Sequence, residues 1–426
     1  MTIENLHQLF IQSSGVCTDT RTLKPNQLFF ALKGANFDGN QYADQALSNG
    51  ASYAIIDNSK LPKTDKHILV NDVLQTLQHL ATYHREQLGI PIIALTGSNG
   101  KTTTKELINT VLSSTYSTTA TAGNFNNHIG VPLTLLSMDN NTEIGIVEMG
   151  ANNPGEIAML SEIALPDYGY ITNIGKAHLE GFKNLAGVLE AKTELYRHLQ
   201  KFNKQIFLNA DDPKLPAKAG TKKLYTFSQK EGYDVQIVLT SANPMVSVSF
   251  DNLAISSQLI GSYNATNIAA AIAIGTYFKI PSITIADAIA SYVPENNRSQ
   301  VLKRDKQLII MDAYNANPTS MTAAIRNLAQ LEAPKKTAFL GDMFEVGATT
   351  AQEHQEILAQ ICATDVQQIF LLGEHFHKTN TNDPRVQQYA SVDELIAIKP
   401  ILSTIEGTIL IKGSRGMKLE RLLEHL

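Results

Sequence analysis

The chain contains 426 residues, enough for two to four domains of ordinary size. Lys and Arg total 35 and Asp and Glu total 40, so the net charge of −5 provides no positive surface of the kind that binds nucleic acid or an anionic membrane. A hydrophobic fraction of 43% excludes a disordered chain, and the two cysteines, Cys17 and Cys362, are too few for a disulfide framework.

The first block of the sequence, residues 1–88, mixes short apolar runs with helical stretches. Residues 27–32 and 52–57 are typical of strands, and residues 72–88 carry apolar side chains at helical spacing. The opening residues, MTIENLHQLF, lack a basic segment followed by an apolar one, so we expect no signal peptide. No apolar run approaches the roughly 18–20 residues that a membrane span needs. We therefore expect a cytoplasmic protein.

The second block, residues 89–297, alternates apolar runs with helical segments. This alternation favours βαβ units and a largely parallel sheet. Within residues 225–250 the runs VQIVL and MVSVSF predict a β hairpin, and residues 185–199 predict a helix. Further strands are expected at residues 92–95, 143–150, 167–175 and 205–210.

The third block, residues 298–426, has the pattern of a second α/β domain. Residues 307–318 (QLIIMDAYNANP) predict a strand followed by a loop, and residues 337–343, 368–374 and 407–416 predict further strands. The fold class is therefore α/β with three domains: a small α/β N-terminal domain, a central domain with a mainly parallel sheet, and a C-terminal Rossmann-like domain.

A glycine-rich loop lies at residues 96–107 (TGSNGKTTTKEL), between a predicted strand and a predicted helix. Gly97 and Gly100 permit a tight turn whose backbone N–H groups face phosphate oxygens, and the helix adds its positive N-terminal end. Lys101 can reach the β and γ phosphates, and the Thr102 hydroxyl is placed to bind Mg²⁺. The pattern predicts a P-loop ATPase domain.

The loop departs from the common phosphate-binding motif at one position. Leu95 stands where that motif has its first glycine, so the pattern is G-x-x-G-K-T. The alternative is a turn of small polar residues that carries a lysine. The preceding strand, the following helix and the Thr after the Lys favour nucleotide binding, although a phosphate loop alone names no reaction.

Two further polar residues follow neighbouring predicted strands. Glu148 stands near the end of the predicted strand EIGIVEMG, at the sheet edge where α/β proteins bind ligands, and could hold a Mg²⁺ that also touches ATP. The alternative is a solvated loop carboxylate. His178 could bind a second cation or orient the substrate, and its alternative is a histidine satisfied by ordinary hydrogen bonds.

Lys192 falls on the apolar stripe of the helix predicted over residues 185–199. It is four residues after Val188 and three before Leu195, both apolar. Burial would lower its pKa and give a neutral amine able to add CO₂ and form a carbamate, which can bind Mg²⁺. The alternative is a lysine that extends its ammonium to solvent from the helix edge.

Together these motifs resemble those of the Mur ligases of peptidoglycan synthesis, over essentially all of the chain. The motifs DAYNANP and GDMFEVG resemble those of the subfamily that adds D-alanyl-D-alanine to UDP-N-acetylmuramoyl-tripeptide. Together they distinguish that subfamily from other Mur ligases and from folylpolyglutamate synthases. The matching stretches are TDTR (18–21), LKGANFDG (32–39), TGSNGKTT (96–103), GNFNNHIGVPLTLL (123–136), EMGAN (148–152), NIGKAHLEGF (173–182), EAK (190–192), NATN (264–267), DAYNANPTSM (312–321), GDMFEVG (341–347) and KGSRG (412–416).

The resemblance implies a site for ATP and two Mg²⁺ ions. Thr102 and Glu148 would bind the first ion, and His178 and carbamylated Lys192 the second; Lys101, Glu148, His178 and Lys192 are the implied catalytic residues. Asn264 and Asn267 would face the adenine side, Arg298 the phosphates and Asp312 the ribose. The implied ATP-binding residues are Gly97, Ser98, Asn99, Gly100, Lys101, Thr102, Thr103, Asn264, Asn267, Arg298 and Asp312.

The resemblance also implies where the other substrates bind. A uridine-nucleotide site in the first domain would use Thr18, Asp19, Thr20, Arg21, Asp38 and Gly39, for which the alternative is a plain surface turn. Asn126 and Asn127 would face the muramoyl-peptide. The implied residues near the dipeptide or the domain seam are Asn315, Asp342, Glu345 and Lys412.

The implied activity is ATP-dependent amide formation through an acyl phosphate. Its substrates would be UDP-N-acetylmuramoyl-tripeptide and D-alanyl-D-alanine, and we expect a monomer that binds no nucleic acid. The alternatives in the same class are another Mur ligase or a folylpolyglutamate synthase. Two alternatives belong to other classes of protein. A nucleotide switch would leave Glu148, His178 and Lys192 without a role. A small-molecule kinase would release ADP without phosphate.

Overall fold

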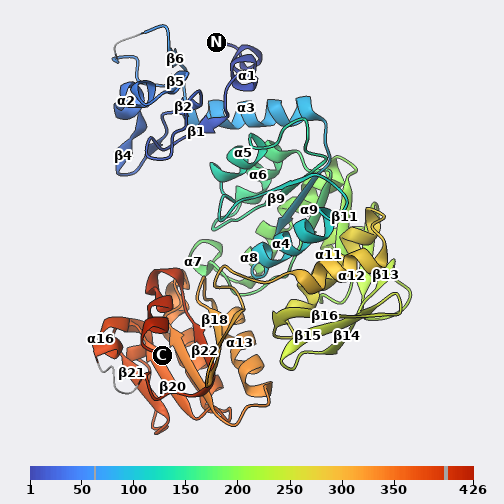
Figure 1. Cartoon of the computed structure of the whole chain (residues 1–426), viewed down its shortest axis with the longest axis vertical. Helices are drawn as coiled ribbons and strands as arrows, with labels where there is room; N and C mark the ends of the chain where they lie inside the picture. The colour runs from blue at the N-terminus through green and yellow to red at the C-terminus, as the bar shows by residue number, and fades with distance from the viewer. Residues whose placement is uncertain (62–63, 398–401) are drawn as a thin grey trace.

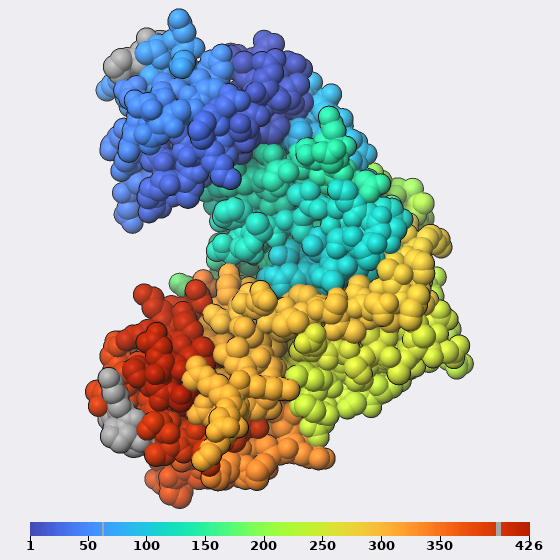
Figure 2. All heavy atoms as spheres, in the orientation of Figure 1, coloured from blue at the N-terminus to red at the C-terminus, as the bar shows by residue number. Residues whose placement is uncertain are grey.

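The computed structural model describes residues 1–61, 64–397 and 402–426, which form three α/β domains in a curved arrangement (Figure 1). The first domain lies at one end of the curve, the third at the other, and the central domain joins them. Figure 2 shows a hollow on the concave side, between the first and third domains, with the central domain as its floor. The three-domain α/β fold predicted from the sequence is confirmed.

The first domain is built on a parallel four-stranded sheet in the order β1-β2-β5-β6. Its core strand β2 has the sequence LFF and is completely buried. Its elements are α1 (Ile3–Ile11), β1 (Val16–Cys17), β2 (Leu28–Phe30), β3 (Lys33–Gly34), β4 (Phe37–Asp38), η1 (Gly39–Tyr42), α2 (Ala43–Ser48), β5 (Tyr53–Ile56), β6 (His67–Leu69) and α3 (Val73–Leu88).

Helix α3 joins the first domain to the central one (Figure 1). It begins after Asp72, whose carboxylate accepts a hydrogen bond from the backbone N–H of Gln75 at 2.8 Å, and it ends at Gly89, which has a φ of +62°. The helix packs on α1 on one side and on two helices of the central domain, α5 (Gly130–Leu135) and α6 (Glu156–Ala164), on the other.

The central domain contains a parallel sheet of seven strands in the order β13-β12-β11-β10-β7-β9-β8. Strand β7 lies between β9 and β10, so the loops that follow these three strands meet at one edge of the sheet. Its remaining elements are β7 (Ile92–Thr96), α4 (Lys101–Leu112), β8 (Thr118–Ala120), β9 (Ile144–Glu148), β10 (Tyr168–Ile171), α7 (Leu179–Phe182), α8 (Leu185–Lys192), α9 (Glu194–Lys201), β11 (Gln205–Asn209), α10 (Pro216–Ala219), β12 (Leu224–Ser228), β13 (Val235–Gln236), α11 (Asn264–Tyr277) and α12 (Ser282–Ser291).

The hairpin predicted within residues 225–250 is present, but it begins later than expected. Strands β14 (Val238–Ser241), β15 (Met245–Phe250) and β16 (Leu253–Ile260) form a small antiparallel sheet. The run VQIVL is divided between β13, at the edge of the parallel sheet, and β14. The strand that contains Tyr225 belongs to the parallel sheet, because its neighbour β11 offers a buried edge.

The single helix predicted over residues 185–199 is also divided, into α8 and α9, at Thr193. The Thr193 hydroxyl donates hydrogen bonds to the backbone carbonyls of Leu189 and Glu190, at 2.8 and 3.2 Å. Such bonds compete with regular helix bonding and favour a local change of direction. The apolar stripe continues across the break, and Lys192 ends α8 on its buried face.

The third domain has a six-stranded sheet in the order β17-β18-β22-β19-β20-β21, parallel except for β17. Its elements are β17 (Gln300–Arg304), β18 (Gln307–Asp312), α13 (Pro318–Gln330), β19 (Lys336–Gly341), η2 (Gly347–Thr349), α14 (Thr350–Cys362), β20 (Gln368–Leu372), α15 (Glu374–His377), β21 (Val386–Tyr389), α16 (Val392–Ala397), β22 (Gly407–Lys412), η3 (Arg415–Met417) and η4 (Leu419–Glu424). The boundary expected near residue 88 coincides with the end of α3, and the one expected near residue 297 lies between α12 and β17.

Candidate active site

A cleft of about 710 Å³ lies where the central and third domains meet. Its walls come from loops after β7, β9 and β10 on one side and from loops after β18, β19 and β22 on the other. It brings together most of the residues singled out from the sequence. Those that line it are Ser98, Asn99, Gly100, Lys101, Thr102, Thr103, Asn126, Asn127, Glu148, His178, Asn264, Asn267, Arg298, Asp312, Asn315, Glu345 and Lys412.

The glycine-rich loop has the tight geometry predicted for it. Gly97 and Gly100 have φ values of +145° and +79°. A β carbon on Gly97 would lie 1.9 Å from the Thr172 hydroxyl, and one on Gly100 would lie 2.6 Å from Oδ1 of Asn267. The loop turns into the N-terminus of α4, and Nζ of Lys101 donates to the Gly97 carbonyl at 2.8 Å. This arrangement presents backbone N–H groups and an ammonium to an anion.

The tip of this loop is held by polar side chains from both domains. Asn99 exchanges two hydrogen bonds with the Asn173 carboxamide, at 3.0 and 3.1 Å, and its carbonyl accepts one from Thr172 at 2.6 Å. From the third domain, Nδ2 of Asn317 donates to Oδ1 of Asn99 at 2.8 Å. No sequence pattern singled out Asn173 or Asn317, although both lie in the family-like stretches NIGKAHLEGF and DAYNANPTSM.

Asn264 and Asn267 connect α11 to the phosphate loop. Oδ1 of Asn267 accepts a hydrogen bond from the Thr104 hydroxyl of α4 at 3.1 Å, and its Nδ2 donates to Asn264 at 2.7 Å. Asn264 in turn donates to the Ile260 carbonyl at 2.8 Å. Both side chains are buried, so they position α4 and the loop as well as facing the cleft.

Glu148 is a buried carboxylate in the lining of the cleft. Its side chain is 1% exposed, and Oε1 accepts a hydrogen bond from Nδ2 of Asn126 at 2.8 Å. Oε2 is buried and has no hydrogen-bond partner in the described parts of the chain. A buried oxygen of this kind is costly unless it meets a cation. The alternative of a solvated loop carboxylate is therefore wrong.

Lys192 is completely buried behind the same wall. Its Nζ donates to the Ala151 carbonyl at 3.1 Å and lies 5.2 Å from the centre of the Phe182 ring. Burial, reinforced by the charge of Lys101, lowers the pKa of Lys192 well below its ordinary value. The alternative of an ammonium that reaches solvent is wrong, and a neutral amine is what addition of CO₂ requires.

His178 lies at the seam between the domains. It has a φ of +51°, and its Nδ1 forms a 2.5 Å hydrogen bond with the carboxylate of Glu345, whose own φ is +60°. The carbonyl of Glu345 also accepts from the backbone N–H of Glu180 at 3.2 Å. His178 lowers the pKa of the Glu345 carboxyl. The contact orients the imidazole and leaves Nε2 as the nitrogen available to a ligand.

On the third-domain wall, Asp312 and Lys412 form an ion pair of 2.6 Å, and Lys412 also donates to the Asn315 carbonyl at 3.3 Å. The guanidinium of Arg298 stacks on the Tyr314 ring at 3.7 Å, and its Nε is buried without a partner among the described residues. The flat face of the Arg298 guanidinium is therefore covered by the Tyr314 ring, and its N–H edge is directed toward the cleft.

The linker that carries Arg298 is attached to the phosphate-loop helix. Glu106 of α4 accepts hydrogen bonds from the Tyr292 hydroxyl at 2.6 Å and from Nδ2 of Asn296 at 2.9 and 3.0 Å. Burial and the Glu106 carboxylate raise the pKa of Tyr292. The next residues, Asn297 and Ser299, have φ values of +56° and +53°. No feature of the sequence pointed to this attachment.

Some residues singled out from the sequence lie outside the cleft. Asp342 is buried, and its two carboxylate oxygens accept from the backbone N–H groups of His375 and Phe376, both at 2.9 Å, so it caps α15. Gly97 and Lys192 lie behind the cleft wall. The candidate uridine-site residues form a separate group in the first domain, namely Thr18, Asp19, Thr20, Arg21, Asp38 and Gly39.

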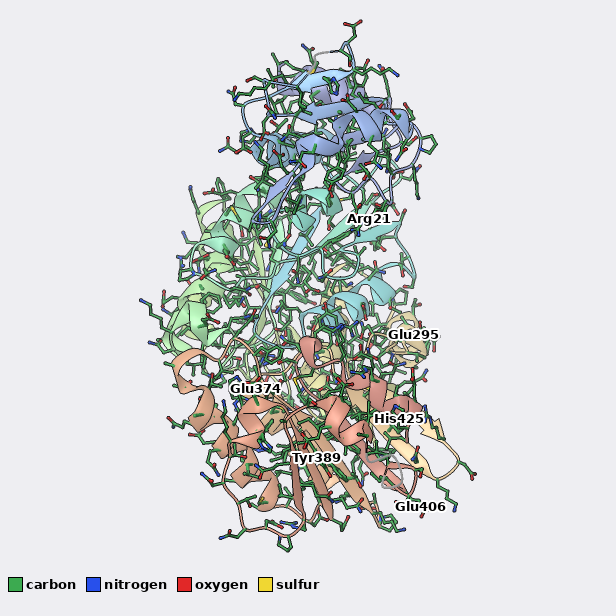
Figure 3. The ribbon with its side chains drawn as sticks, turned by 90° about the vertical axis from the view of Figure 1, so that its left-hand side faces the viewer. Arg21, Glu295, Glu374, Tyr389, Glu406 and His425 are labelled. Carbon is green, nitrogen blue, oxygen red and sulfur yellow. The ribbon has the colours of Figure 1, made fainter. Side chains whose placement is uncertain are left out.

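The first-domain group is built from two turns. The Arg21 guanidinium donates to the Asp19 carboxylate at 2.6 Å and lowers the pKa of Asp19 to about 2. Asp38 accepts from the backbone N–H of Asn40 at 3.0 Å and begins η1. In Figure 3, Arg21 lies at the edge of the first domain that borders the central domain. Within this group Arg21 is exposed, Gly39 is buried and the other residues are half-buried.

Comparisons with known proteins agree with this geometry. Family models match as the Mur ligase family catalytic domain over residues 12–94, the Mur ligase middle domain over residues 95–275 and the Mur ligase glutamate ligase domain over residues 297–415. The UDP-N-acetylmuramoyl-tripeptide--D-alanyl-D-alanine ligase of Bacillus subtilis is 38% identical, with 97% of this chain and 93% of that protein aligned. The ligase of the same name from Escherichia coli is 32% identical, with 98% and 94% aligned.

Solved structures show the same similarity. MurF from Acinetobacter baumannii superposes with a TM-score of 0.87 at 29% identity and covers 99% of this chain and 98% of its own. MurF ligase from Thermotoga maritima, solved in complex with ADP, superposes with a TM-score of 0.84 at 28% identity and covers 97% of each chain.

Proposed function

Because this chain belongs to the Mur ligase family, we propose that it is the member that joins D-alanyl-D-alanine to UDP-N-acetylmuramoyl-tripeptide with consumption of ATP. The observation that carries the proposal is the single cleft that gathers a phosphate loop, a buried carboxylate and cations from two domains. The full-length similarity to ligases of that name supplies the substrates.

The chemistry follows from the poor leaving ability of a carboxylate oxygen. The terminal carboxylate of the tripeptide attacks the γ phosphorus of ATP, the bond from that phosphorus to the β-phosphate oxygen breaks, and ADP leaves. The amine of D-alanyl-D-alanine then attacks the acyl carbon and loses a proton. Phosphate departs and carries one oxygen of the original carboxylate, which leaves an amide.

The chain's own groups counter the repulsion between two anionic reactants. Lys101 and the N-terminus of α4 face the phosphates, and Arg298 approaches from the linker with its stacked face fixed by Tyr314. The seam bonds from Asn317 to Asn99 and from Glu345 to His178 hold the third domain against the same loops. Closure of this kind protects an acyl phosphate from water.

Magnesium fits the residues present. The unpartnered Oε2 of Glu148 and the Thr102 hydroxyl at the start of α4 are oxygen donors suited to one ion, which would neutralise charge on the phosphates. Within the described residues, no three His, Cys, Asp or Glu side chains cluster as a metal site, so oxygens of ATP and water would complete the shell. A second ion at His178 requires the carbamate of Lys192, whose buried amine fits that modification.

We assign the first-domain turns around Asp19, Arg21 and Asp38 to the uridine nucleotide, since Arg21 lies at the edge of the first domain that faces the rest of the molecule (Figure 3) and both turns present polar groups. Of the described helices, none has both the length and the apolar character to cross a membrane. We place the enzyme in the cytoplasm, where ATP is available, and expect it to act as a monomer.

The test offers the purified protein a panel of amines with UDP-muramoyl-peptides and measures phosphate and ADP release. Release of both that depends on D-alanyl-D-alanine and on the tripeptide supports the proposal. Release with single amino acids or with folate substrates indicates another ligase of this class. ADP without phosphate indicates a kinase, and no amine-dependent turnover indicates a nucleotide switch.

A further inference from the structure

Among the described residues, the third-domain side of the cleft carries one cation to which the proposed ATP chemistry assigns no role. Lys412 is neutralised by Asp312 at 2.6 Å and is 1% exposed. Arg298 has its guanidinium face on Tyr314. Arg415, at the start of η3, also lines the cleft, and its side chain is 58% exposed.

The contacts of Arg415 leave most of its donors available. Its Nη1 lies 3.5 Å from a carboxylate oxygen of Glu420, and the guanidinium carbon lies 5.9 Å from the centre of the Tyr314 ring. The remaining N–H groups of the guanidinium have no hydrogen bond in the described parts of the chain. An arginine held loosely at one edge can present two parallel donors to a carboxylate.

An apolar side chain lies beside this arginine. Phe344 is 44% exposed, and its ring is so close to Gly416 that a β carbon there would lie 2.7 Å from it. The backbone N–H of Phe344 donates to the Ser414 hydroxyl at 2.9 Å, and the N–H of Ser414 donates to the Asp342 carbonyl at 3.2 Å. These bonds fix the loop at residues 413–416 against the loop that carries Phe344.

We propose that Arg415 binds the free carboxylate of the amine substrate and that Phe344 packs against its side-chain methyl groups. The inference rests on the proposed function and names the chemical feature of the dipeptide that this wall recognises. A dipeptide bound there has its carboxylate on the third domain and its amine toward the phosphate loop of the central domain. The same cation lets the enzyme distinguish a dipeptide acid from its neutral amide.

The test compares Arg415→Gln with the unchanged enzyme, using D-alanyl-D-alanine and its C-terminal carboxamide as alternative amines. We expect the KM for the acid to rise about 10- to 100-fold in the variant, as for loss of a charge-assisted hydrogen bond. The KM for the carboxamide should stay within about twofold, so the preference for the acid disappears. Arg415→Lys should keep part of that preference because it keeps the charge.

Arg421→Gln is the matched control, because Arg421 of η4 pairs with Asp393 of α16 and does not line the cleft. An equal rise in KM for acid and carboxamide in Arg415→Gln would overturn the proposal, as would a rise confined to the KM for ATP. Failure of the unchanged enzyme to use D-alanyl-D-alanine at all would instead contradict the proposed function, so the two failures are distinguishable.

Discussion

Buried lysines in the central domain show how their surroundings assign different chemistry to one type of side chain. Burial lowers the pKa of Lys101, but its ammonium donates to the phosphate loop and lines the cleft, where the Glu148 carboxylate and the phosphates of a bound nucleotide favour its charged form. Lys192 is sealed behind the wall with one carbonyl partner, and burial lowers its pKa well below the ordinary value. The position of Lys192 on the apolar stripe does not determine whether its side chain reaches solvent or is buried. The tertiary packing around it determines this.

Replacement of Lys101 tests the phosphate-loop assignment. In Lys101→Ala we expect phosphate release to fall at least about 1000-fold, because a preorganised cation at the transferring phosphoryl group is lost. The thermal unfolding midpoint should change little, since the ammonium makes its hydrogen bond within the loop. Turnover at the level of the unchanged enzyme would remove Lys101 from the mechanism.

Replacement of Lys192 tests the carbamate. Lys192→Ala should lose nearly all activity and recover part of it when acetate or another short carboxylate is added, because the added anion can occupy the place of the carbamate. Lys101→Ala serves as the control, since a carboxylate cannot replace its cation. Full activity of Lys192→Ala without any additive would contradict the assignment.

At the scale of helices and strands, the sequence predicted those elements that depend on the local pattern of apolar and turn residues. The strands before the phosphate loop and Glu148, and the helix that carries Lys192, follow from apolar periodicity and turn residues. The bond from Asn317 to Asn99 and the attachment of Glu106 to the linker could not be predicted. Each joins polar residues far apart in the sequence, and each partner alone has the character of a loop or a solvated helix face.

The attachment of the linker to α4 predicts an effect on rate. Glu106→Ala frees the segment that carries Arg298, so we expect kcat to fall about tenfold, as for loss of hydrogen bonds to a charged group. Binding of ADP, measured by calorimetry, should stay within about twofold because the phosphate loop is intact. The control is Glu295→Gln, an exposed linker residue (Figure 3). Equal losses in the two variants would contradict a special role for Glu106.

At the scale of the whole molecule, the joints between domains have different characters. The third domain meets the central one through bonds at the catalytic loops, including Lys176 Nζ to Glu353 at 2.6 Å and the Lys176 N–H to Thr319 at 2.9 Å. The first domain meets it through α1 and α3. There Nε2 of His7 and Nδ1 of His84 are 3.1 Å apart, and His84 also bonds the Met138 carbonyl at 2.9 Å.

This histidine pair predicts a loss of stability in acid. Burial lowers the pKa of both His7 and His84 below 6.5, so as the pH falls through that value the unfolded chain takes up protons before the folded one does. The thermal unfolding midpoint should therefore decrease when the pH is lowered from 7.5 to 5. In His7→Gln, which can still donate to His84 but does not titrate, the fall should be smaller. The same pH dependence in both proteins would contradict a role for the pair.

Isotope transfer from the tripeptide tests the chemistry most directly. Tripeptide substrate with ¹⁸O in its terminal carboxylate is converted with ATP and D-alanyl-D-alanine, and the phosphate released is examined by mass spectrometry. Attack of that carboxylate on the γ phosphorus predicts one ¹⁸O atom in each phosphate when both oxygens are labelled. Phosphate that contains no ¹⁸O, released together with the amide product, would contradict an acyl phosphate.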